Sequence, residues 1–170
     1  MASLMDNFMD VLNQEEEHYR KLAALSHEKT DVLIRADIDR LQEITEAEQL
    51  ETDVLHNLDL QRESILKDMS VVLRKSKEEL TIEKMIELLE KQPDEQQRLI
   101  DLRVRLRSTM DDMIKANEQN KMLLKTAMEM VEFDMTLFRS LRQAPETANY
   151  DRHAVNTGDL LGSSGFDAKQ

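Results

Sequence analysis

Two short runs of the sequence place a carboxylate three residues before a histidine, Glu15 with His18 and Asp53 with His56. On a helix the two members of such a pair share one face, which is how carboxylate bundles bind iron. A di-iron site needs Glu-x-x-His on two helices and a further inward Glu on each of two others, whereas the second run here carries Asp. The spacing therefore favours a histidine packed between helices over a metal ligand.

Other arrangements that are typical of catalysis do not occur in the sequence. The chain has no cysteine, which excludes disulfides, thiolate metal sites and Cys–His pairs. The first glycine is Gly158, so no glycine-rich phosphate loop can precede it. No serine lies in a nucleophile-elbow context. We therefore predict that the protein is not an enzyme and that it takes no metal and no cofactor.

The negative net charge of the chain limits the classes of molecule that it can bind. A formal net charge of -12 would repel a phosphate backbone, and no basic stripe is interleaved with aromatic residues, so nucleic-acid binding is not expected. Binding to an anionic membrane surface is disfavoured for the same reason. No stretch approaches the roughly 20 apolar residues of a membrane span, and the N-terminal residues do not resemble a signal peptide. The expected location is the cytoplasm, without membrane insertion.

The first part of the chain predicts a helical hairpin. Apolar residues recur at three- and four-residue steps from a potential cap at Ser3 to about Arg35. The run "RADID" breaks this pattern, and Asp37 suits the cap of a second helix with a near-heptad apolar repeat. Because the connection is so short, the two helices must be antiparallel.

The second part predicts a short helix capped by Thr81 and a third long helix that starts at Pro93 and ends near Leu141 or Gln143. Ala144-Pro145 ends it, because the residue before a proline is pushed out of helical geometry. The fold class is therefore all-α: an elongated antiparallel bundle of three long helices plus one short helix over residues 1–143. Residues 144–170 are polar, contain all three glycines and predict a flexible C-terminal tail. Its apolar anchors are Leu160, Leu161 and Phe166.

Polar residues interrupt the apolar stripes of two helices. Glu48 and Arg62 lie within the stripe of the second helix, and Asn117 and Asn120 lie in line with an apolar stripe of the third. Buried polar groups of this kind commonly fix the register of packed helices. We predict a structural role for all four.

Two apolar stripes remain near the end of the third long helix, on a helix that turns about 100° per residue. The first stripe, which we predict to pack in an intramolecular seam, consists of Leu124, Ala127, Met128, Val131, Met135 and Phe138. The second stripe, to the side and rear of the first, consists of Met122, Leu123, Met130, Phe133, Leu137 and Leu141. One neighbouring helix cannot cover both stripes. The second stripe therefore predicts either a docking surface or further packing, within the chain or in a homodimer.

The order of a hairpin, a short helix, a long helix and a tail with a lone Tyr150 resembles the FlgN-type flagellar export chaperones. The resemblance covers essentially the whole chain. Its more specific parts are the acidic turn with the leucine, threonine, glutamate and arginine that follow it, and the paired asparagines before the terminal apolar helix. These residues are Ala36, Asp37, Leu41, Thr45, Glu48, Arg62, Asn117 and Asn120.

The resemblance implies a cytosolic chaperone of flagellar type III secretion. Such a chaperone binds the C-terminal helical regions of the hook-filament junction (hook-associated) proteins, prevents their premature assembly and delivers them to the export gate and the export ATPase complex. The second stripe would be its client-binding surface, and Tyr150 would contact the cytoplasmic domain of the gate. The alternative, from another class of protein, is a structural coiled-coil adaptor or homodimerisation module without a client.

Overall fold

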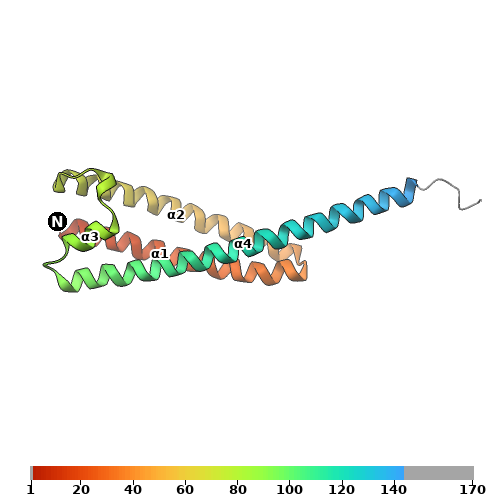
Figure 1. The fold of residues 1–170 in the computed structure, drawn as a ribbon, viewed down its shortest axis with the longest axis horizontal. Helices are drawn as coiled ribbons and strands as arrows, with labels where there is room; N and C mark the ends of the chain where they lie inside the picture. The colour runs from red at the N-terminus through yellow and green to blue at the C-terminus, as the bar shows by residue number, and fades with distance from the viewer. Residues whose placement is uncertain (1, 144–170) are drawn as a thin grey trace, which may run out of the picture. The chain divides into compact units, whose positions relative to one another are not determined.

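The computed structural model describes residues 2–143, and Figure 1 shows how their helices follow one another. In chain order the elements are α1 (Ala2–Arg35), α2 (Ile38–Leu73), the 3-10 turn η1 (Lys77–Glu79), α3 (Ile82–Leu88) and α4 (Pro93–Gln143). The all-α fold, with long helices that pack together as a bundle, is confirmed. The predicted tail, with Tyr150 and the three apolar anchors, lies outside the described residues.

The chain divides into two compact units, Met1–Lys125 and Thr126–Gln170, so the boundary between them falls inside α4. The predicted division between residues 143 and 144 is a different one, since it marks the end of the helical pattern, and it stays a prediction. The first unit contains α1, α2, η1, α3 and most of α4. In the second unit, the described residues are the last part of α4.

The turn between α1 and α2 forms as the sequence predicts. Ala36 adopts a left-handed conformation (φ 55°), which reverses the chain within two residues. The Asp37 side chain then caps α2 by accepting a hydrogen bond from the backbone N–H of Arg40 at 3.1 Å. Side-chain pairs between the helices, including Lys29 with Glu48, confirm that α1 and α2 are antiparallel. A carboxylate cap of this kind satisfies an amide that the first helical turn would otherwise leave without a partner.

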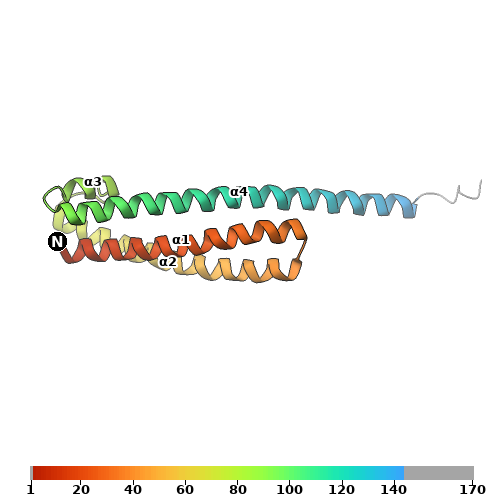
Figure 2. The same cartoon turned by 90° about the horizontal axis from the view of Figure 1, so that it is seen from below.

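A second set of caps positions α3. The Thr81 hydroxyl accepts a hydrogen bond from the N–H of Lys84 at 3.2 Å, and Pro93 is the first residue of α4, both as predicted. Figures 1 and 2 both show α3 beside the N-terminal end of α1 and the start of α4. The side chain of Met85 on α3 is completely buried there, so this short helix closes one end of the core.

The core of the first unit gathers apolar side chains from all its helices. Phe8 of α1, Met69 of α2, Met85 of α3 and Leu99 of α4 are each at most 2% exposed. The other buried members of this cluster are Met5, Met9, Leu12, Leu66, Leu80, Leu89, Leu102 and Leu106. Burial of such side chains is the main favourable term in folding, so this end of the unit carries much of its stability.

The predicted register-fixing asparagines connect α1 to α4. The Ser26 hydroxyl donates a hydrogen bond to Asn117 Oδ1 at 2.8 Å, and the Thr30 hydroxyl donates one to Asn120 Oδ1 at 2.6 Å. Asn120 Nδ2 donates a further bond to the carbonyl oxygen of Ser26 at 2.7 Å. From the first of these pairs to the second, the residue number increases in both helices, so α4 runs parallel to α1. The structural role predicted for the two asparagines is confirmed.

Replacement of Asn120 by alanine is expected to lower the free energy of unfolding by about 1–3 kcal/mol, because Asn120 is buried and its loss removes two hydrogen bonds between α1 and α4. Urea denaturation followed by circular dichroism would measure the change. Gln119→Ala is the matched control, since Gln119 is exposed on the same turn of α4 and its truncation should change the stability by less than about 0.5 kcal/mol. Equal stabilities for the two variants would refute the register role.

Candidate functional site

The three histidines within residues 2–143 lie between helices or in solvent. His18 Nδ1 lies 2.5 Å from Glu51 Oε2, which joins α1 to α2, while Glu15 turns to Arg62 instead. His56 of the second run is exposed. Within residues 2–143 there is no group of three or more His, Cys, Asp or Glu side chains that could hold a metal ion. His18 thus has the packed position that the sequence favoured.

Arg62 and Glu48 occupy structural positions. Arg62 Nε donates to Glu15 Oε1 at 2.9 Å, and a second nitrogen of its guanidinium bonds Asp59. Burial raises the pKa of the Glu15 carboxyl, and the opposing influence of Arg62 does not fully offset it. Glu48 accepts a hydrogen bond from Lys29 Nζ at 2.6 Å. The Arg62–Glu15 and Lys29–Glu48 pairs join α1 to α2, so the predicted structural role of Arg62 and Glu48 is confirmed.

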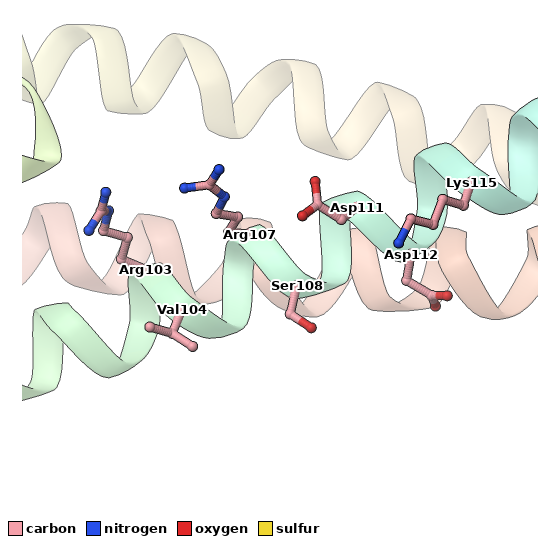
Figure 3. A pocket seen from close by; sticks show the side chains of 7 residues that line it. All are labelled: Arg103, Val104, Arg107, Ser108, Asp111, Asp112 and Lys115. Carbon is pink, nitrogen blue, oxygen red and sulfur yellow. The ribbon is translucent and has the colours of Figure 1, made fainter.

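An open hollow of about 480 Å³ runs along α4 in the first unit. Figure 3 shows its lining: Arg103, Arg107 and Asp111 on one side of α4, Val104, Ser108 and Asp112 on the other, and Lys115 at its end. Charges of both signs line it. Arg103 forms an ion pair with Glu83 at 2.6 Å, and Asp112 forms one with His27 at 3.0 Å. Because several of its polar groups bind neighbouring side chains, the hollow offers a small ligand no convergent set of contacts.

The second stripe lies exposed on α4. Phe133 is 67% exposed and Leu137 is 47% exposed, and Met122, Met130 and Leu141 are also exposed. Leu123 is the exception, because its side chain is partly buried in the first unit. From Met130 onward the members of the second stripe are therefore all exposed apolar side chains of the second unit.

The first stripe is not packed in an intramolecular seam, and this prediction is wrong. Val131 is 58% exposed and Phe138 is 67% exposed, and the other four members are exposed as well. The reason is the register of α4 on α1. Ser26 pairs with a residue 91 positions later, and at that offset α1 reaches its last residue, Arg35, at about residue 126 of α4.

The last part of α4 is consequently an exposed apolar helix. Every residue from 126 to 143 is exposed, and apolar side chains cover most of its circumference, apart from a polar strip that includes Glu132 and Arg139. Monomeric proteins seldom expose apolar surface of this extent, and where they do it commonly marks a binding site. Sequence reasoning missed the exposure of the first stripe. The signal was present in the helix lengths, because α4 has 51 residues and α1 has 34.

Comparison with known proteins places the chain in a family. The family model described as FlgN protein matches residues 1–158, almost the whole of the chain. No curated protein and no solved structure gives a significant match. Among the described residues, no helix has an apolar stretch that is long enough to cross a membrane.

Proposed function

The chain belongs to the FlgN family, whose members are flagellar export chaperones, and we propose which proteins it binds and where. Its clients are the hook-filament junction (hook-associated) proteins, bound through their C-terminal helical regions in the cytoplasm. The chaperone prevents their premature assembly or aggregation. It then delivers them to the export gate and the export ATPase complex.

The exposed second stripe is the observation that supports this proposal. An amphipathic helix binds a partner by laying its apolar face on a complementary apolar surface, with anchors at three- and four-residue steps. Met130, Phe133, Leu137 and Leu141 follow that spacing and are all exposed. A client helix on these residues would have its own apolar face covered, so it could not assemble with other copies of itself.

The methionines suit a chaperone that serves more than one client. Met122 and Met130 belong to the second stripe, and Met128 and Met135 belong to the first. A methionine side chain is unbranched and polarizable, so it can repack against surfaces of different shape. This property explains why an acidic, highly charged chain has several methionines in the exposed last part of α4.

Co-expression with individual hook-associated proteins tests the proposal. We expect a 1:1 or 2:2 complex to co-elute in size-exclusion chromatography, and removal of the client's C-terminal helical region to abolish it. A client that co-elutes equally well without that region would contradict the proposed binding mode. Failure of every hook-associated protein to bind would remove the proposed clients altogether.

Tyr150 is proposed to contact the cytoplasmic domain of the export gate, on the basis of its place in the sequence after the terminal helix. Tyr150→Ala should leave client binding intact and weaken binding to the isolated gate domain in a pull-down. Equal gate binding by both proteins would exclude this role.

The alternative is a homodimerisation module without a client. The exposure of both stripes supports this alternative, because a second copy of the chain could cover them. The seams of the first unit argue for a localised docking site instead, since Arg62, Asn117 and Asn120 interrupt any long heptad repeat. Light scattering would separate the two, because only the alternative requires a stable dimer in the absence of hook-associated proteins.

A further inference from the structure

One acidic residue lies inside the apolar surface of α4. On a helix the nearest surface neighbours of a residue are three and four positions away, and for Asp134 these are Met130, Val131, Leu137 and Phe138. All four are exposed apolar residues, two from each stripe. The Asp134 carboxylate therefore lies at the junction of the first and second stripes.

Asp134 has no basic neighbour on its own helix. The positions at which an ion pair along a helix forms are three and four residues away, and none of them holds Lys or Arg. Among residues 2–143, no ion pair or side-chain hydrogen bond to the Asp134 carboxylate occurs. In the first unit, by contrast, the half-buried acids Glu48 and Glu51 each have a cationic or histidine partner.

A partner that covers both stripes must also cover Asp134. An ionised carboxylate loses its hydration when an apolar surface closes over it, at a cost of several kcal/mol unless an opposite charge and hydrogen bonds replace the water. Because Asp134 lies between the stripes, a partner that covers both of them cannot leave the carboxylate in solvent. The partner must supply the compensating charge.

We propose that the client contacts both stripes of α4 and places a lysine or arginine on Asp134. This inference rests on the proposed function and names the chemistry of the client surface: apolar anchors on two sides of a basic residue. The basic residue fixes the register of the client helix on α4, because a shift by one residue would leave Asp134 buried without a partner. Asp134 is thus a specificity residue, and the apolar stripes supply affinity.

The test compares variants that change charge equally at two places on α4. The probe is the purified C-terminal helical segment of a hook-associated protein, with binding measured by isothermal titration calorimetry. Asp134→Asn should raise the Kd about threefold to tenfold, and Asp134→Lys about tenfold or more. Val131→Ala, on the first stripe, should also weaken binding. Glu132→Gln is the matched control, since Glu132 lies on the polar strip and its substitution should leave the Kd unchanged.

A charge exchange makes the assignment specific. The lysines and arginines of the probe are replaced by glutamate one at a time, and one of these replacements should restore binding to Asp134→Lys while it weakens binding to the unmodified chaperone.

If Leu137→Ala weakens binding but Val131→Ala and both Asp134 variants do not, the inference fails while the proposed function stands. If Leu137→Ala also binds undiminished, the proposed client surface itself fails. A Val131→Ala variant that changes only self-association, measured by light scattering, would assign the first stripe to a second copy and overturn the inference.

Discussion

Truncation of Phe8 to alanine is expected to lower the free energy of unfolding by about 3–5 kcal/mol. Phe8 is 2% exposed and belongs to the cluster in which α1, α2, α3 and α4 meet. Its removal would take away the transfer free energy of a phenyl ring and leave a cavity that the surrounding helices fill only in part. Urea titration of both proteins, followed by circular dichroism, would measure the loss.

Phe133→Ala is the control for this experiment, since it makes the same truncation at a residue that is 67% exposed. We expect its free energy of unfolding to stay within about 0.5 kcal/mol of the unmodified protein. Both variants replace phenylalanine by alanine, so a difference in their stability reflects the burial of the side chain and not its type. A Phe133→Ala variant that unfolds as readily as Phe8→Ala would mean that α4 packs in solution against something that covers Phe133.

The double replacement of Met130 and Leu137 by alanine is expected to weaken client binding by about 2–5 kcal/mol, with little change in folding stability. Interface energy concentrates in a few apolar anchors, each of which costs roughly 1–3 kcal/mol when truncated. Both side chains are exposed in the chaperone, so their removal leaves no cavity in its core. Calorimetric titration with a hook-associated protein, together with urea denaturation of the free chaperone, would measure both quantities.

Leu50→Ala is the matched control for the client-binding experiment. Leu50 is 67% exposed on α2, so the same side chain is truncated outside the proposed surface. The Kd of the Leu50→Ala variant for the client should equal that of the unmodified protein. Equal weakening by Leu50→Ala and Leu137→Ala would show that the loss of any exposed leucine is sufficient, and the second stripe would lose its special role.

The stability of Val131→Ala distinguishes a buried Val131, which the sequence pattern predicts, from the exposed Val131 of the structure. The periodicity of the first stripe predicts a buried Val131, whose truncation would then destabilise the fold. Because Val131 is 58% exposed, we now expect its truncation to leave folding stability nearly unchanged. The correction follows from the length of α1, which no local pattern in α4 contains.

The sequence by itself determined which segments are helical and which residues begin α2, α3 and α4. Asp37, Thr81 and Pro93 each act locally, as a cap or as a first-turn residue, so their positions could be predicted without knowledge of the partner helices. The asparagines could be predicted as register residues, since a polar side chain within an apolar stripe needs a partner across the seam. The sequence did not identify Ser26 and Thr30 as those partners, because an asparagine can bond many groups.

Only the tertiary structure decided which apolar residues of α4 are covered. An apolar stripe predicts that a helix face is used, but the same pattern serves a seam within the chain and a surface for another protein. The choice depends on the register between α1 and α4, which hydrogen bonds more than 80 residues apart in sequence establish. In the structure nearly all residues of both stripes, and Asp134 between them, are exposed. Contacts so distant in sequence leave no trace in local periodicity.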